Sequence, residues 1–223
     1  MAKSKHFQKL KDHATKDWKF KQGISIQACY KSWILSPETY SKIERGVCAA
    51  LTLEWLQGKL NWTGLGSFDL LKSSSIDERN EMLVESVAKR QIKANKYASA
   101  EKGRKLCEAL GKQLNLKVLD NEEYQKDKKF KDHFVYAHGD KDLHSKGLMI
   151  IYHLSEVAAH AVGACRLDSG FHFFDANLGA YVVKDPEKFA EEYVQRYADS
   201  PQGKWVIDTA YCVQLEPIDN LFI

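Results

Sequence analysis

Cys48 stands between a glycine-led turn and a run of apolar residues, in the stretch ERGVCAALTLEWLQG at residues 44–58. Leu51, Trp55 and Leu56 share a helical face with it, so we expect Cys48 at the start of a short, buried helix. The N-terminus of a helix carries about half a positive charge, which lowers the pKa of a cysteine there. The pattern therefore suits a nucleophilic thiolate, although a cysteine that only packs in the core fits it as well.

Gly46 adds a second feature in favour of the nucleophile. A glycine lets the backbone turn tightly into the helix, and the amide of Cys48 would then point at a developing oxyanion. The other four cysteines lie within helical or strand patterns and follow no such turn. We interpret them as packing residues: Cys29, Cys107, Cys165 and Cys212.

A nucleophilic cysteine needs a base, which does not have to be close to it in sequence. Of the eight histidines we select His160, because it opens the β-rich run HAVGACRL at residues 160–167. Asp175 ends the next run, FHFFD, just before an Asn-Leu-Gly turn. A carboxylate at that place can hold the imidazole in one tautomer, so we predict a triad of Cys48, His160 and Asp175.

The hairpin between these two runs limits the proposed pair. If residues 168–170 form its loop, Gly163 faces Asp175 and His160 faces Leu178. Strict alternation then places His160 and Asp175 on opposite faces of the hairpin. A bulge, a wider loop, or an Asp175 lying just past the regular strand would bring them together. The spacing alone leaves the pairing open.

The elements that must position these residues follow from the hydrophobic pattern. The N-terminal half carries amphipathic helical patterns over 4–21, 76–98 and 100–114. The C-terminal half changes to short β-rich runs, interrupted by a helical pattern over 185–200 and ending with a strand over 204–217. Helices followed by mostly antiparallel strands predict an α+β fold.

Composition excludes several classes of protein. The 223 residues carry a net charge of +3 with both signs spread along the chain, so we expect no nucleic-acid partner. The five cysteines form no CxxC pair, and the odd count favours a reduced protein. No run approaches the roughly 20 apolar residues of a membrane span, and the first residues lack the pattern of a signal peptide. We expect a chain made in the cytoplasm without a signal peptide.

One cluster of residues between the two halves suggests a metal site. Its spacing matches none of the known closed patterns, and the lysines between its members indicate a solvated loop. Thiol chemistry also needs no metal or organic cofactor, so we expect neither. The cluster comprises His133, His138, Asp140, Asp142 and His144.

Two motifs together resemble one known family. GVCAALTLEWL, with Cys48, and the distant AHAVGACRLDSGFHFFDANLGAYVV, with His160 and Asp175, look like the YopT/AvrPphB-type papain-like cysteine proteases. The order and spacing carry the resemblance: 112 positions separate Cys48 from His160, and 15 more lead to Asp175. It implies a papain-like fold with a helical lobe packed on an antiparallel sheet. We expect one domain over 1–223, helical to about residue 120 and sheet-forming from about residue 145.

The resemblance also bears on the oxyanion. Papain-like enzymes generally place a glutamine or another amide side chain shortly before the nucleophile, and YSKIERGV has none. Gln27 is the nearest upstream glutamine and becomes the candidate side-chain donor.

The implied function is a thiol hydrolase that cleaves an amide bond. The resemblance implies a bacterial effector, delivered by a dedicated secretion apparatus and acting on a protein of the recipient cell. A chaperone or an immunity protein would be a further partner. Three alternatives stay open: an NlpC-type toxin that cuts peptidoglycan stem peptides, a transacylase or deamidase with the same triad, and an interaction module that binds through residues 76–114.

Overall fold

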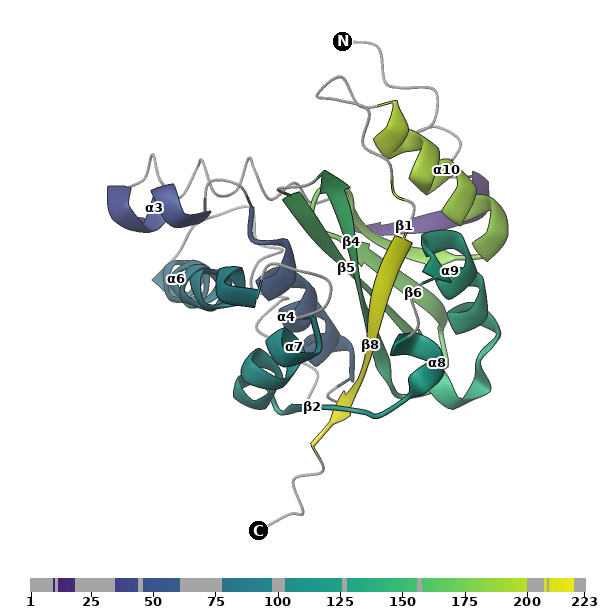
Figure 1. Ribbon diagram of the computed structural model, residues 1–223, viewed down its shortest axis with the longest axis horizontal. Helices are drawn as coiled ribbons and strands as arrows, with labels where there is room; N and C mark the ends of the chain where they lie inside the picture. Colours follow the sequence, from purple (N-terminus) through teal and green to yellow (C-terminus); the bar gives the residue numbers. More distant parts are fainter. Residues whose placement is uncertain are drawn as a thin grey trace.

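The computed structural model describes residues 10, 12–18, 35–43, 46–60, 78–97, 103–125, 128–155, 158–199, 207 and 209–218. Among them, eight strands form one antiparallel sheet in the order β1-β7-β6-β5-β4-β8-β2, with β3 pairing on β8 (Figure 1). The strands are β1 (Ala14–Trp18), β2 (Leu116–Val118), β3 (Lys128–Lys129), β4 (Gly147–Ser155), β5 (Ala158–Leu167), β6 (Gly170–Asp175), β7 (Gly179–Val183) and β8 (Thr209–Pro217).

Helices cover both faces of this sheet (Figure 1). Helix α4 packs on β4 and β5, with α6 and α7 beside it, whereas α9 and α10 cover the opposite face. No helix in the described part of the chain is both long and apolar enough to cross a membrane. The helices are α3 (Pro37–Ile43), α4 (Cys48–Leu60), α6 (Glu78–Ala94), α7 (Gly103–Gly111), α8 (Glu122–Gln125), α9 (Phe130–Gly139) and α10 (Pro186–Ala198).

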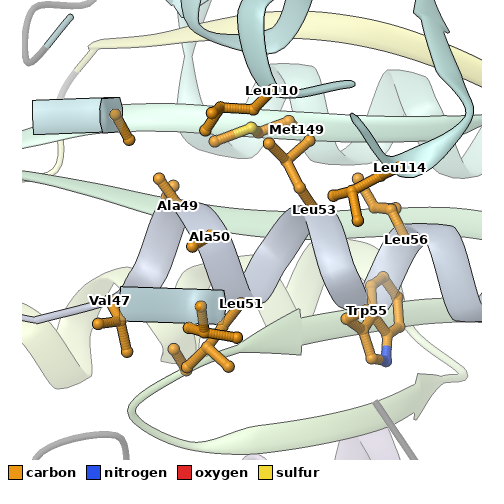
Figure 2. Close-up of a cluster of buried hydrophobic side chains, with 14 of the residues drawn as sticks. Val47, Ala49, Ala50, Leu51, Leu53, Trp55, Leu56, Leu110, Leu114 and Met149 are labelled. Atoms are coloured by element: carbon orange, nitrogen blue, oxygen red, sulfur yellow. The ribbon is translucent and has the colours of Figure 1, made fainter. Parts of the chain in front are cut away.

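Helix α4 is buried on nearly all sides. Figure 2 shows its apolar side chains next to Leu110, Leu114 and Met149. On the sheet side the Trp55 ring stacks on Phe174, with their centroids 5.5 Å apart. A short, apolar helix of this kind gains its stability from packing rather than from its own propensity. The helix predicted to begin at Cys48 is confirmed.

The opposite face of the sheet is lined by aromatic rings. Along β6, Phe171 and Phe173 belong to the cluster under α9 and α10, whereas Phe174 belongs to the cluster under α4. This alternation follows from the period of two along a strand. Phe134 of α9 contacts both Phe171 and Phe173 edge to face at 5.3 Å. The run FHFFD therefore contributes side chains to the apolar clusters on both faces of the sheet.

Two segments differ from the sequence-based expectation. Residues 14–18 form β1, not part of a helix over 4–21, because they pair with β7 and satisfy the backbone groups of its open edge. Residues 130–139 form α9, where the charges suggested a solvated loop. Phe130 and Phe134 are buried there, so apolar packing outweighs the charged positions between them. Helices α6 and α7 lie where the patterns placed them.

Gly163 offers a test of how closely α4 packs on the sheet. A Cβ atom at this position would lie 3.0 Å from the Trp55 ring and 3.2 Å from the Thr52 side chain. We expect Gly163→Ala to lower the free energy of unfolding by about 1–3 kcal/mol, measured by urea denaturation. Gly139→Ala is the control, since nothing lies within 4 Å of its Cβ position. Equal stability of the two variants would contradict this packing.

Candidate active site

The register of the β5–β6 hairpin puts His160 and Asp175 on the same face of the sheet. Leu167 pairs with Gly170, so the turn contains two residues instead of the three considered above. Val162 therefore pairs with Asp175, and His160 lies two residues before Val162. Residues two apart on a strand point to the same side. Gly170 makes the shorter turn feasible, since its φ of 125° is one that side chains disfavour.

His160 and Asp175 are joined by a hydrogen bond. The His160 Nε2 lies 3.0 Å from Asp175 Oδ1, and the side chains are 3% and 0% exposed. An ionised carboxylate only accepts hydrogen bonds, so Nε2 carries the proton and donates. The other ring nitrogen, Nδ1, is left for a second partner.

Cys48 is the first residue of α4 and interacts with the His160 ring. The imidazole acts electrostatically on the thiol, and each group shifts the pKa of the other toward its charged form. Cys48 is partly exposed, whereas Cys107, Cys165 and Cys212 are buried. Gly46 has a φ of 131° two residues earlier, so the glycine turn expected from the sequence is present. Cys48 and the His160 imidazole thus interact at the start of the helix.

The electrostatics of the three groups favour charged forms. Burial raises the pKa of the Cys48 thiol, but the charge and hydrogen bond of His160 outweigh it, so this pKa lies below the ordinary value. Burial alone would lower the pKa of His160, but the charges and hydrogen bonds of Asp175 and Cys48 raise it to about 10. Burial also opposes ionisation of Asp175, yet His160 and other donors hold the carboxyl pKa below its usual range. These shifts favour a thiolate at Cys48, an imidazolium at His160 and a carboxylate at Asp175.

Comparison with known proteins identifies the family of this chain. The sequence model of the family Peptidase C58, described as Yersinia/Haemophilus virulence surface antigen, matches residues 8–204. The chain belongs to this family. It is a cysteine peptidase, and the family is one of bacterial virulence proteins. No curated protein matches the chain in sequence.

A solved structure supports the fold of the peptidase. The Pseudomonas avirulence protein AvrPphB superposes with a TM-score of 0.56 and 14% sequence identity. The match covers 76% of the peptidase and 91% of the AvrPphB chain. At this identity the likeness concerns the fold alone, and it confirms the papain-like α+β architecture expected from the sequence motifs.

The first turn of α4 in the peptidase is capped from a neighbouring helix. The backbone N–H of Ala50 donates to Gln91 Oε1 of α6 at 3.1 Å. Gln91 Nε2 donates to Asn95 at 2.8 Å, and Asn95 donates to the carbonyl of Lys42 at 3.1 Å. This chain of bonds satisfies one free amide at the helix start and ties α3, α4 and α6 together. Sequence reasoning missed Gln91, because it stands unmarked among the polar residues of a helical pattern.

Two further sequence-based candidates have separate outcomes. Gln27, the expected oxyanion donor, lies outside the described residues, as does Cys29. In the suspected metal cluster, the side chains bind different partners: His133 contacts the carbonyl of Ala210 at 3.1 Å, and Asp140 accepts from Tyr124 at 2.6 Å. Within the described ranges, no group of three or more His, Cys, Asp or Glu residues is arranged to hold a metal ion.

The lowered pKa of Cys48 predicts selective alkylation. Iodoacetamide reacts with the thiolate, so it should modify Cys48 well below the ordinary thiol pKa of about 8.5. Burial raises the pKa of Cys165 to about 12 and also raises that of Cys107 and Cys212, so these three should react slowly. Mass spectrometry after brief treatment at a series of pH values measures each rate.

His160→Ala tests the cause of this reactivity. Without the imidazolium the pKa of Cys48 rises, so the midpoint of the alkylation curve should move to higher pH. The rate near pH 6.5 should then fall by about tenfold or more. Uniform labelling of the described cysteines, or the same midpoint in both proteins, would contradict the ion pair.

Proposed function

We propose that Cys48, His160 and Asp175 form the catalytic triad of this peptidase. The observation that carries the proposal is the buried hydrogen bond between His160 Nε2 and Asp175 Oδ1, on an imidazole that also meets Cys48. Membership in a cysteine peptidase family supports this assignment. Cys48 is partly exposed, unlike the buried Cys107, Cys165 and Cys212.

The reaction follows from the charge states of the three groups. The Cys48 proton passes to His160 Nδ1, and the thiolate attacks the carbonyl carbon of the scissile amide. His160 then protonates the leaving amine, and the C–N bond breaks to leave a thioester on Cys48. A water molecule, deprotonated by His160, attacks the thioester and releases the carboxylic acid and the thiol. Asp175 holds the imidazole in the tautomer that these proton transfers need.

The oxyanion of each tetrahedral intermediate needs hydrogen-bond donors. The backbone N–H of Cys48 stands at the N-terminus of α4, where the first amides have no partner within the helix. We assign it as one donor, with Gln27 as the candidate side-chain donor. The positive end of the α4 dipole favours the negative charge as well.

We further propose that the substrate is a protein of a cell that receives the peptidase through a dedicated secretion apparatus. Two descriptions support this role: the family is named for a virulence surface antigen, and the structural neighbour is an avirulence protein. A chaperone in the producing bacterium or an immunity protein would be its other partner.

Matched variants test the triad. His160→Ala and Cys48→Ala should lower the cleavage rate by about 10⁴-fold or more, since each removes a member of one proton relay. His144→Ala is the control, because its ring also binds an aspartate, Asp168, at 2.8 Å, but on the surface. It should keep the wild-type rate.

The measurement uses purified protein and an extract of eukaryotic cells, in which mass spectrometry identifies newly formed N-termini. Isolated peptidoglycan is treated in parallel. New N-termini that form with the wild type but not with Cys48→Ala support a protein substrate. Release of stem peptides from peptidoglycan, without any new protein N-termini, would overturn the proposed protein substrate. Equal loss of activity in His144→Ala and His160→Ala would argue against the assignment of His160.

A further inference from the structure

Two tyrosines of α10 donate hydrogen bonds to the carboxylate of Asp175. The hydroxyls of Tyr193 and Tyr197 each lie 2.7 Å from Asp175 Oδ2. Their spacing of four residues places both on the same face of the helix. Tyr193 is 0% exposed and Tyr197 is 5% exposed, so these bonds are shielded from water.

The other carboxylate oxygen also has two donors. His160 Nε2 donates to Asp175 Oδ1 at 3.0 Å, and the backbone N–H of Asn177 donates to it at 2.6 Å. Asp175 therefore accepts four hydrogen bonds, two on each oxygen. Hydrogen bonds to the charged form of a carboxyl group favour that form, even where burial opposes it. The arrangement holds an ionised carboxylate and leaves it one orientation.

Each tyrosine hydroxyl is itself oriented by a further donor. Tyr152 of β4 lies 2.6 Å from the Tyr193 oxygen, and the Asn177 side chain donates to the Tyr197 oxygen at 3.3 Å. Since the hydroxyls of Tyr193 and Tyr197 use their own protons toward Asp175, their oxygens accept these bonds. A chain of hydrogen bonds of this kind strengthens its members.

The rings that carry the hydroxyls are fixed by aromatic packing. Tyr193 stacks on Phe130 with centroids 5.0 Å apart, and the Tyr197 ring lies 5.9 Å from that of His160. Asp185 caps the start of α10 by accepting from the backbone of Lys188 at 3.1 Å. The hydroxyls thus reach Asp175 from a helix that is held at its start and along its length.

We propose that Tyr193 and Tyr197 are positioning residues, which hold Asp175 ionised and aimed at His160. This inference rests on the triad proposed above. It assigns α10 a part in the reaction, since the helix supplies half of the hydrogen bonds to the carboxylate. The tyrosines act through Asp175 and His160 and do not touch the reacting atoms.

The surroundings of Asp175 contain several titratable groups, which a pH experiment must consider. His160 and Cys48 are the catalytic neighbours, and Tyr152, Tyr193 and Tyr197 face the carboxylate from β4 and α10. Tyr181 of β7 also interacts with Asp175, and burial raises the pKa of that hydroxyl to about 12. The pKa of each tyrosine is raised, so none of the four titrates below pH 8, where the test is made.

The sign of the expected effect follows from the charge of Asp175. Its pKa lies below the usual range, so the ionised form, with its hold on the imidazolium, is present at neutral pH and is lost as the pH falls through that pKa. Removing donors raises the pKa of the carboxyl group. The carboxylate then loses its charge at a higher pH and no longer orients the imidazolium toward Cys48, so the thiolate loses its aligned partner.

The experiment measures the alkylation of Cys48 by iodoacetamide between pH 3 and pH 8 in the full chain. Tyr193→Phe with Tyr197→Phe should move the acid midpoint upward by about one pH unit or more, and each single variant by less. Tyr124→Phe is the matched control, because the hydroxyl of this buried tyrosine also donates to an aspartate, Asp140 Oδ2, at 2.6 Å. Its profile should equal that of the wild type.

A proton NMR spectrum gives a second reading that packing alone would not change. The Nε2-bound proton of His160 should resonate far downfield in the wild type and in Tyr124→Phe, and should move upfield in the double variant. If the double variant does not fold, Tyr197→Phe alone decides by the same two readings. Wild-type readings in the folded tyrosine variants, while His160→Ala shifts the alkylation curve, would overturn the positioning role. An unshifted curve in His160→Ala would instead overturn the triad.

Discussion

The buried carboxylate of Asp175 is the constraint on which the rest of the site depends. An ionised group that leaves water is costly unless donors replace its hydration. Here the donors come from β5, from α10 and from the turn after β6, and the carboxylate needs them together. The relative placement of these elements is therefore tied to one side chain. The same side chain fixes the proton on His160 Nε2 and so decides which nitrogen meets the sulfur.

The sheet holds the two halves of the site on opposite sides. His160 and Asp175 belong to the face under α9 and α10, whereas Cys48 begins a helix that packs on the other face. The position of α4 along β5 is set by contacts further down the helix: Thr52 Oγ1 donates to the carbonyl of Ala161 at 3.1 Å, and Trp55 lies against the site of Gly163. The sulfur reaches the imidazole because these contacts fix the rotation and height of the helix.

The sequence predicted those parts of the fold and site that depend on local pattern. The apolar period placed the helix at Cys48, and the β-rich runs placed β5 and β6. The strand over residues 14–18 was not predicted, because an edge strand takes its conformation from pairing with a distant partner, here β7. The hairpin register was not predicted either. The turn contains only Asp168 and Ser169, and a difference of one residue in its length moves every side chain of the paired strand to the other face of the sheet. Tyr193 and Tyr197 helped to predict the helix over 185–200, but their bonds to Asp175, like that of Gln91 to Ala50, could not be predicted because the partners are far away in the sequence.

Tyrosine hydroxyls and water molecules differ in the entropy that is lost when they are held in place as hydrogen-bond donors to Asp175. A water molecule could donate to Asp175 Oδ2 equally well, but it would have to be immobilised there and could exchange. The hydroxyls of Tyr193 and Tyr197 are already fixed by ring packing on α9, β4 and β6, so their freedom is lost when the chain folds. Donors that need no rearrangement during the reaction are the ones that stabilise charge most effectively. The aromatic core under α10 therefore contributes to both the stability and the chemistry of the site.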